Sequence, residues 1–321
     1  MAGSRNSRSN EPVAAAVRAA IERSGAPSSI VVAYSGGLDS SVLLHVAVAV
    51  ARARSITIRA VHVNHRISPN AFRWEAFCRT VCRNLGVPLA VKRVTVPATT
   101  GIGLEAAARI ARYRAFEATN GDAILLAHHL DDQAETVLFN LCRGGGPTAA
   151  AGMRPRRGRF LRPLLHLERK VLEHYAKEHR LAWIEDESNA DPALRRNYLR
   201  GEMLPRLERA IPAAGRNLAA AADRFSEACA LLDDLARLDL GEESRGFPVS
   251  RGRFASLSEP RARNALRYLL EQAHVSIPSD DTLREAVRQL RAAAPDRHPL
   301  IHFGPYRLRC SRGVVSVDRT A

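Results

Sequence analysis

The sequence predicts an α/β protein: a doubly wound, mostly parallel sheet, followed by a second, smaller α+β domain. Between residue 30 and about residue 183, short apolar runs alternate with segments of helical periodicity. Runs such as 30–32 and 124–126 are continuous Val, Ile and Leu, which is typical of strands buried on both faces of a parallel sheet. After residue 212 the composition changes to Ala-, Leu- and Arg-rich helix. This order of patterns indicates a doubly wound domain and a separate second domain.

The individual elements of the first domain follow from the same patterns. Its expected strands lie at residues 30–34, 56–63, 89–94, 123–127 and 181–184. Its expected helices lie at residues 40–53, 71–85, 104–120 and 132–143. Asn120 and Gly121 provide a C-terminal stop for the third of these helices, because both residues adopt left-handed backbone readily. A Gly- and Arg-rich break follows at residues 143–159.

The second domain is expected to begin with a helix. This helix is expected at residues 213–240, and two further helices at 259–274 and 279–293. Three strands are expected after them, at 300–303, 306–310 and 314–317. We therefore divide the chain into an N-terminal tail with a first helix (1–24), a main domain (25–212) and a linker helix with a C-terminal domain (213–321).

The charge balance indicates a partner that carries phosphates. The chain has 48 Lys and Arg against 33 Asp and Glu, a formal net charge of +15. Nearly all of this positive charge is Arg, whose planar fork pairs with phosphate through two hydrogen bonds. A GC-rich genome would also favour Arg over Lys, but it does not explain the net excess. The composition therefore favours nucleic acid as the partner.

Targeting signals and cysteine usage indicate a cytoplasmic protein. No run approaches the roughly 18 apolar residues of a membrane span, and the first dozen residues lack the apolar segment of a secretory signal. The cysteines are odd in number and scattered, which argues against a disulfide framework: Cys78, Cys82, Cys142, Cys229 and Cys310.

The loop after the first expected strand has the composition of an anion site. It reads Ser-Gly-Gly-Leu-Asp-Ser at residues 35–40, and its glycines let backbone N–H groups turn toward the N-terminus of the next helix. The Gly-Lys-Ser/Thr ending of a Walker A loop is missing. Asp39 is then either a magnesium ligand or a helix cap. The alternative is a plain strand–turn–helix connection without a ligand.

A second polar stretch follows the fourth expected strand. The segment Ala-His-His-Leu-Asp-Asp-Gln-Ala-Glu-Thr at 127–136 lies at the carboxyl edge of the sheet, where ligands bind. His128 and His129, with carboxylates at 131, 132 and 135, could hold an amine, a metal or both. Asp132 and Glu135 also match a capping-box variant, which is the structural alternative. Zinc is disfavoured because no Cys or third His falls at ligand spacing nearby.

Two further segments carry positive charge. Arg109 and Arg112 share one face of the helix expected at 104–120. The segment 185–200 opens with acidic and turn-forming residues and continues into a helix that carries Arg195, Arg196 and Arg200. Taken alone, the first segment favours a solvated helix in which Glu105 pairs with the arginines of the same helix. The second, taken alone, is typical of a capped surface helix.

Together these motifs resemble a known family. Ser-Gly-Gly-Leu-Asp-Ser at 35–40 resembles the PP-loop of ATP pyrophosphatases, which are Rossmann-like α/β enzymes. The whole set resembles the tRNA(Ile)-lysidine synthetases: His-Val-Asn-His at 62–65, Ala-Arg-Tyr at 111–113, His-His-Leu-Asp-Asp-Gln-Ala-Glu-Thr at 128–136, Arg-Gly-Gly-Gly at 143–146, Arg-Pro-Leu-Leu at 162–165, and the acidic segment from 185 with Arg-Asn at 196–197. The match covers nearly all of the first 210 residues and is looser beyond them. The family often has Asp where Asn64 stands, and longer members carry a further C-terminal domain for which this chain has no room.

The resemblance implies a reaction. Such enzymes use ATP to adenylate C2 of the wobble cytidine of tRNA(Ile) with a CAU anticodon, and the ε-amine of L-lysine then displaces AMP. It also implies a C-terminal domain that binds the tRNA substrate, and a homodimer.

The resemblance also implies roles for individual residues. The expected ATP-binding residues are Ser35, Gly36, Gly37, Leu38, Asp39 and Ser40. Asp39 would hold Mg²⁺, and Asp132 and Glu135 would bind lysine with help from His128 or His129; Asp39, Asp132 and Glu135 are therefore the expected catalytic residues. The expected tRNA-binding residues are Arg109, Arg112, Arg143, Arg195 and Arg196.

Two other functions remain open at this point. A tRNA thiolation enzyme of the same superfamily would need a reactive Cys or paired cysteines, whereas Cys78 and Cys82 have the helical spacing of packed residues. A non-catalytic RNA-binding protein would not need both polar motifs intact.

Overall fold

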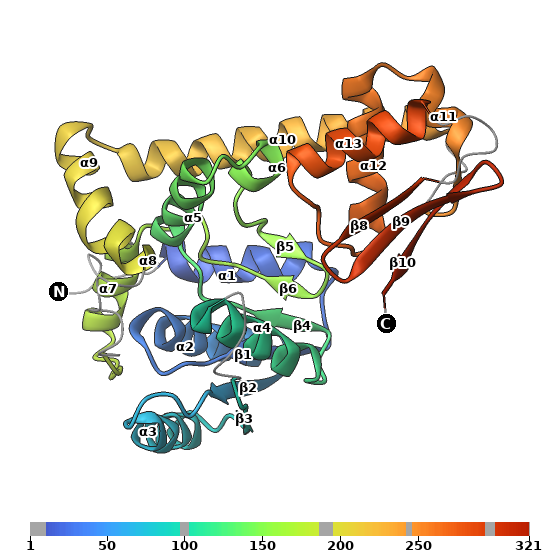
Figure 1. Cartoon of the computed structure of the whole chain (residues 1–321). Coiled ribbons are helices and arrows are strands. Elements are labelled where there is room, and N and C mark those ends of the chain that lie inside the picture. The colour runs from blue at the N-terminus through green and yellow to red at the C-terminus, as the bar shows by residue number, and fades with distance from the viewer. Residues whose placement is uncertain (1–10, 97–102, 186–194, 242–245, 293–298, 321) are drawn as a thin grey trace. The chain divides into compact units, whose positions relative to one another are not determined.

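The computed structural model describes residues 11–96, 103–185, 195–241, 246–292 and 299–320 (Figure 1). The chain divides into two compact units, Met1–Arg224 and Phe225–Ala321. Helix α10 (Ala214–Leu240) contains the point of division. None of the helices in the described part is long and apolar enough to cross a membrane.

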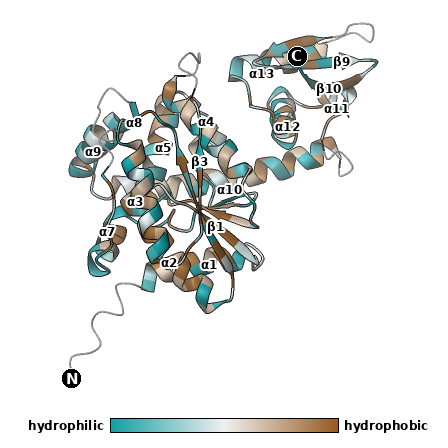
Figure 2. Cartoon of the chain, turned by 90° about the horizontal axis from the view of Figure 1, so that it is seen from below, coloured by the Kyte–Doolittle hydropathy of each residue, from teal (hydrophilic) through white to brown (hydrophobic). Residues whose placement is uncertain are grey.

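The first unit is built on a six-stranded sheet in the order β3-β2-β1-β4-β6-β5. The strands are β1 (Ser29–Ala33), β2 (Thr57–Asn64), β3 (Leu89–Arg93), β4 (Ala123–Leu125), β5 (Arg156–Arg157) and β6 (Phe160–Leu161). All neighbours are parallel except β5 and β6. The central strands β1 and β4 are mainly apolar (Figure 2), as expected for strands covered on both faces, whereas β3 and β5 at the edges carry Lys or Arg.

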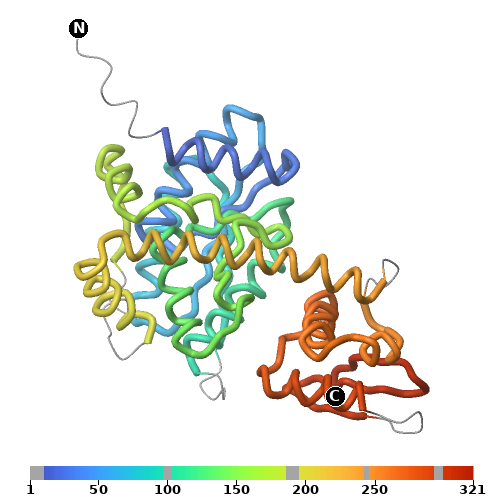
Figure 3. Tube along the Cα trace, turned by 90° about the horizontal axis from the view of Figure 1, so that it is seen from above, coloured from blue at the N-terminus to red at the C-terminus, as the bar shows by residue number. Residues whose placement is uncertain are grey.

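Helices cover both faces of this sheet, which confirms the doubly wound prediction. Alternate residues of β1 face opposite sides: Ile30 and Val32 belong to one apolar cluster, and Val31 belongs to another. The first cluster includes α1 (Glu11–Arg23), α2 (Leu38–Ala53), α3 (Ala71–Asn84) and α7 (Arg169–Glu178). The second includes α4 (Leu104–Glu117). Although α7 is distant in sequence, it lies beside α1 and α2 (Figure 3).

One predicted strand is wrong. Residues 181–184 form no strand; they pack against the first cluster through Leu181 and Trp183, and the N–H of Ile184 donates to the carbonyl of Gly36 at 2.9 Å. The parallel neighbour of β4 is β6 instead, with Ile124 paired to Phe160. Strand β6 has only two residues and follows an Arg- and Gly-rich stretch. The sequence therefore contains no periodic pattern long enough to predict it.

The second unit packs helices against a four-stranded antiparallel sheet in the order β7-β10-β9-β8. Its elements are β7 (Val249–Ser250), α11 (Arg251–Ser256), α12 (Glu259–Gln272), α13 (Asp280–Ala292), β8 (Leu300–Phe303), β9 (Tyr306–Ser311) and β10 (Val314–Arg319). Phe254, Leu269 and Leu290 are fully buried in its own core. The α+β prediction for this unit is confirmed.

A buried carboxylate fixes the end of β2 to α3 and β3. Glu75 on α3 is 4% exposed, and its Oε1 accepts from Arg93 at 2.8 Å and from Arg79 at 3.0 Å. Its Oε2 accepts from the side-chain amide of Asn64 at 3.2 Å. Hydrogen bonding from Arg93, and then from Arg79 and Asn64, outweighs burial and lowers the pKa of Glu75 to about 2.

This network predicts a pH-dependent effect of Glu75→Gln. Because the folded state lowers the pKa of Glu75, its stabilisation is present above the unfolded pKa of about 4.3 and is lost as the pH falls toward 2. The variant should lower the free energy of unfolding at pH 7 by about 1–3 kcal/mol. Denaturant titrations between pH 7 and pH 2 should show this difference shrink below about pH 4.

The matched control is Glu173→Gln, whose carboxylate pairs with Arg169 at 3.3 Å on the exposed face of α7. It should change stability little at any pH. A Glu75→Gln deficit that persists unchanged to pH 2 would contradict the network.

Candidate active site

The loop between β1 and α2 folds around two serines. The hydroxyls of Ser35 and Ser40 are 3.0 Å apart, and the Ser40 hydroxyl donates to the carbonyl of Gly37 at 3.0 Å. The N–H of Gly37 donates to the Ser35 hydroxyl at 3.3 Å. These bonds hold the loop at the N-terminus of α2, where the first backbone N–H groups have no intrahelical partner. This is the geometry expected of an anion site.

Gly36 is required by the conformation of this loop. Its φ is +91°, and a Cβ built there would lie 2.9 Å from Cδ1 of Ile184 and 3.0 Å from Sγ of Cys78. Gly37 has an ordinary φ of −73°, and a Cβ built there would meet its nearest atom at 3.6 Å. The two glycines therefore act differently: the loop conformation excludes a side chain at position 36 only.

Asp39 does not cap the helix that it begins. The N-cap of α2 is Gly37, and no side chain caps this end. Within the described part of the chain, Oδ1 of Asp39 is buried without a hydrogen-bond partner, and Oδ2 lies 3.6 Å from Nε2 of His129. A carboxylate oxygen is therefore available at the mouth of the anion site. This is the donor that Mg²⁺ uses when substrate phosphates supply its other ligands.

His129 connects this loop to the loop that follows β4. It is 2% exposed, and its ring nitrogens lie 3.4 Å from Asp131, 3.4 Å from Asp132 and 3.6 Å from Asp39. Burial alone would lower its pKa, but the carboxylates of Asp131, Asp39 and Asp132 raise the pKa of His129 to about 10. The ring is therefore an imidazolium at neutral pH. It ties the carboxyl ends of the neighbouring strands β1 and β4.

The capping box was predicted to be formed by Asp132 and Glu135, but it is formed by His129 and Asp132. Helix α5 (Leu130–Cys142) begins two residues earlier than predicted, so His129 is the N-cap. Asp132 accepts the backbone N–H of His129 at 3.1 Å and is therefore the capping partner. Glu135 lies one turn further along, is 3% exposed and takes no part in the cap.

The carboxylates of Asp132 and Glu135 share one guanidinium. Nη2 of Arg200 lies 2.7 Å from Oδ1 of Asp132 and 2.9 Å from Oε2 of Glu135. Burial raises the pKa of Glu135, and the positive charge of Arg200 acts against that rise. Arg196 is more distant, with Nε 3.8 Å from Glu135. The predicted amine-binding carboxylates are thus adjacent, and they hold a cation.

A basic region adjoins this acidic one. Arg109 on α4 lies over the ring of Tyr113 at 5.1 Å, and the hydroxyl of the same tyrosine accepts from Arg162 at 3.3 Å. Arg162 is 6% exposed, and its Nε is buried without a hydrogen-bond partner among the described residues. Arg109, Arg112 and Arg162 have no carboxylate within ion-pair distance in this part of the chain. Such uncompensated positive charge favours an anionic ligand.

The neighbouring histidines therefore carry different charges. Burial, followed by the positive charges of Arg162, Arg109 and Arg112, lowers the pKa of His128 well below its usual value. His128 is neutral at physiological pH, whereas His129 is protonated. Environments that separate two adjacent pKa values in this way are typical of acid–base sites.

The other arginines that were predicted to bind tRNA, Arg143, Arg195 and Arg196, lie at the rim of the candidate site. Arg143 and Arg196 both lie over the ring of Phe139, at 5.2 Å and 5.8 Å. Arg196 also lies 3.4 Å from Glu105, so the expected pairing of Glu105 within its own helix is replaced by a pairing between segments. Arg195 is exposed. Sequence reasoning did not assign Arg162 or Arg200 to the site; a charged residue inside the apolar run Phe-Leu-Arg-Pro-Leu-Leu at 160–165 was the available signal for Arg162.

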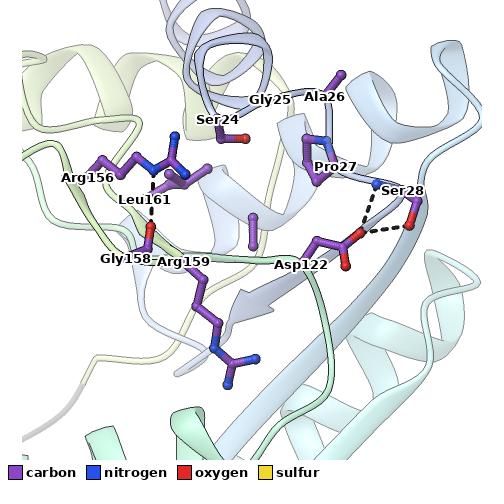
Figure 4. A pocket seen from close by; sticks show the side chains of 11 residues that line it. Ser24, Gly25, Ala26, Pro27, Ser28, Asp122, Arg156, Gly158, Arg159 and Leu161 are labelled. Atoms are coloured by element: carbon purple, nitrogen blue, oxygen red, sulfur yellow. Dashed lines mark hydrogen bonds between the residues drawn. The ribbon is translucent and has the colours of Figure 1, made fainter.

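A small cavity of about 260 Å³ lies at the opposite ends of these strands (Figure 4). It is lined by Ser28, Asp122, Arg156 and Arg159 among others. Asp122 accepts from the backbone and hydroxyl of Ser28, and Arg159 donates to backbone carbonyls at the end of α4. Its polar groups serve the fold, so this cavity is not a second candidate.

Comparison with known families agrees with this geometry. The family model described as PP-loop domain matches residues 10–207. The model described as TilS substrate binding domain matches residues 250–315. A solved structure of the U34-tRNA thiolase NcsA from Methanococcus maripaludis has the same fold, with a TM-score of 0.56, 17% identity, and coverage of 68% of this chain and 78% of that one. The fold and the loop thus define a protein of the PP-loop class.

Curated relatives narrow the class to one family. A tRNA(Ile)-lysidine synthase from Alkalilimnicola ehrlichii is 44% identical over 291 residues, which cover 89% of this chain and 65% of the relative. One from Nitrosomonas europaea is 38% identical, covering 89% and 64%. One from Pseudomonas putida is 42% identical, covering 88% and 69%. The chain belongs to the tRNA(Ile)-lysidine synthase family, and it spans about two thirds of the length of these relatives.

The loop geometry predicts different effects of alanine at its two glycines. Gly36→Ala should lower the free energy of unfolding by about 2–4 kcal/mol, because it combines an unfavourable φ with overpacking against Ile184 and Cys78. Gly37→Ala should cost less than about 1 kcal/mol, because its Cβ meets only ordinary contacts. Urea titrations of both variants check this. Equal losses would show that the fold does not depend on the close approach at Gly36.

Proposed function

We propose that this chain is an ATP-dependent ligase that converts the wobble cytidine of tRNA(Ile) with a CAU anticodon to lysidine. The C2 oxygen of the cytidine would attack the α-phosphate of ATP and release pyrophosphate, and the ε-amine of L-lysine would then attack C2 and displace AMP, which carries that oxygen away. Family membership supports the reaction class. The observation that carries the proposal is the pair of adjacent carboxylates, Asp132 and Glu135, beside the anion-binding loop.

The loop at residues 35–40 suits the pyrophosphate end of ATP. Backbone N–H groups around Gly36 and Gly37, with the hydroxyls of Ser35 and Ser40, provide donors at the N-terminus of α2, and Leu38 begins that helix. Asp39 would hold Mg²⁺ through its free Oδ1. A bound Mg²⁺ would neutralise negative charge on the phosphates during transfer. His129 orients Asp39 from the opposite side.

The basic region suits the phosphate that is transferred and the RNA around it. Arg109, Arg112 and Arg162 present positive charge with no carboxylate within ion-pair distance among the described residues. In a site of low dielectric, fixed cations stabilise the developing charge of an adenylate. The target base must leave its stack to reach them, and Arg143, Arg195 and Arg196 on the rim would hold the surrounding RNA phosphates.

The two histidines support a division of labour in the second step. Lysine must lose a proton from its amine to attack, so a group nearby has to accept it. His128 is neutral and its Nδ1 is buried without a partner in the described part of the chain, so it is the proposed base. His129 is already protonated and would instead hold Asp39 and Asp132 in place. A cytoplasmic location and a homodimer remain proposals that rest on the family resemblance.

The pair Cys78 and Cys82 does not provide a reactive thiol for thiolation. Cys78 and Cys82 are buried in the core, and burial raises the pKa of Cys78 to about 12 and that of Cys82 to about 11. Both therefore stay as thiols, and the packing interpretation of their helical spacing is confirmed.

Asp39→Asn tests the proposed metal ligand. The amide keeps the shape but removes the charge that Mg²⁺ requires, so the variant should fold normally and need far more Mg²⁺ for release of pyrophosphate. A loss of roughly 100-fold or more in rate at low Mg²⁺ is expected. Pyrophosphate release with tRNA and ATP, measured across a Mg²⁺ titration, checks this. An unchanged Mg²⁺ dependence would remove Asp39 from the metal site.

Asp132→Asn and Glu135→Gln test the proposed lysine site. Lysine enters after adenylation, so both variants should still release pyrophosphate, require far more lysine and accumulate adenylated tRNA. Glu202→Gln, which changes an exposed carboxylate paired with Arg206, is the matched control and should leave the KM for lysine unchanged. If both variants keep the normal KM for lysine, or lose adenylation to the same extent, the lysine site lies elsewhere.

A further inference from the structure

Arg200 occupies the oxygens that a bound ammonium group would need. Its Nη2 contacts Oδ1 of Asp132 at 2.7 Å, and both Nη2 and Nε contact Oε2 of Glu135, at 2.9 Å and 3.1 Å. The other oxygen of Asp132 accepts the backbone N–H of His129. Within the described part of the chain, Oε1 of Glu135 has only Nε of Arg196 nearby, at 3.8 Å. A ligand cation that bridges Asp132 and Glu135 must therefore take the place of the guanidinium of Arg200.

The carboxylates require a cation whether or not a ligand is present. Glu135 is 3% exposed, and an unpaired charge at that depth is strongly destabilising. The field of Arg200 opposes the effect of burial on Glu135. Arg200 thus places a positive charge against both carboxylates before a ligand arrives.

Arg200 is attached to an element that differs from the rest of the site. It lies in a single π-helical turn, η2 (Leu199–Met203), between the short helices α8 (Arg195–Tyr198) and α9 (Leu204–Ala210). Turns of this kind are rare and are frequent at functional sites. The side chain is 41% exposed, whereas Glu135 is almost fully buried. The guanidinium can therefore leave toward solvent without disturbing α5.

We propose that Arg200 is an exchangeable occupant of the lysine subsite and thereby determines which amino acids can enter it. The inference rests on the proposed function. A ligand binds only by replacing one positive charge with another, so the ε- or α-ammonium of lysine can take the place of the guanidinium. An amino acid with a neutral side chain would leave the negative charges of Asp132 and Glu135 without a counter-charge. The guanidinium of Arg200 would then bind them again and displace that amino acid. Arg200 is in this sense a specificity-determining residue, and lysine competes with it.

Arg200→Gln tests the exchange directly. Removing the competing cation should lower the KM for lysine in the second half-reaction, and the Kd for lysine in equilibrium dialysis, by about 3- to 10-fold, because affinity is reduced by the fraction of sites that the occupant holds. Arg200→Lys keeps a cation on the same turn and should stay nearer to the original values. Arg206→Gln, an exposed arginine paired with Glu202, is the matched control and should change neither constant.

Guanidinium ion provides the chemical counterpart. At millimolar concentration, far below the molar range that unfolds proteins, it should raise the KM for lysine of Arg200→Gln back toward the original value. It should change the KM of the unaltered protein much less, because that site already holds a guanidinium.

Two results would overturn the proposal. If Arg200→Gln raises the KM for lysine or loses rate that guanidinium restores, Arg200 assists the substrate instead of competing with it. If the variant leaves lysine binding unchanged, the bridge does not block the subsite. Failure of the proposed function is distinguishable from both, because Asp132→Asn and Glu135→Gln would then leave the lysine constants unaltered.

Discussion

The protonated ring of His129 is the contact on which the arrangement of the site depends. It is buried, yet it stays charged because carboxylates from both neighbouring loops surround it. Asp39 comes from the loop after β1, and Asp131 and Asp132 come from the first turn of α5. Without this imidazolium, three carboxylates would face one another at the carboxyl edge of the sheet. The ring therefore connects the loop at residues 35–40 to the first turn of α5, where Asp132 lies.

His128, the residue before His129, lies in an environment of the opposite charge. Burial, and then the positive charges of Arg162, Arg109 and Arg112, lowers the pKa of His128, so this ring is neutral. The candidate site thus has a basic region beside His128 and an acidic region beside His129. This division suits a reaction in which an adenylate is formed first and a cationic amino acid attacks it afterwards. Arg200 provides the positive charge that the two carboxylates of the acidic region contact.

Much of the fold could be predicted because the signals were local. The apolar runs gave β1 to β4, and the loop composition at residues 35–40 gave the anion site. The strand expected at 181–184 was wrong because an apolar run can also cover a core; Ile184 contacts Gly36 instead. Carboxylates at 132 and 135 were visible in the sequence. Their partner Arg200 is far away along the chain, and no spacing rule connects the two segments.

The central claim is that this site joins lysine to a base of tRNA. Its most direct measurement is mass spectrometry of the nucleosides of tRNA(Ile) with a CAU anticodon, after incubation with the protein, ATP and isotopically labelled lysine. The account predicts that the label appears in lysidine at the wobble position and that tRNA(Met), which has the same anticodon, remains unmodified. A wobble cytidine that stays unchanged, or one that gains sulfur when a sulfide donor is added, would contradict the account.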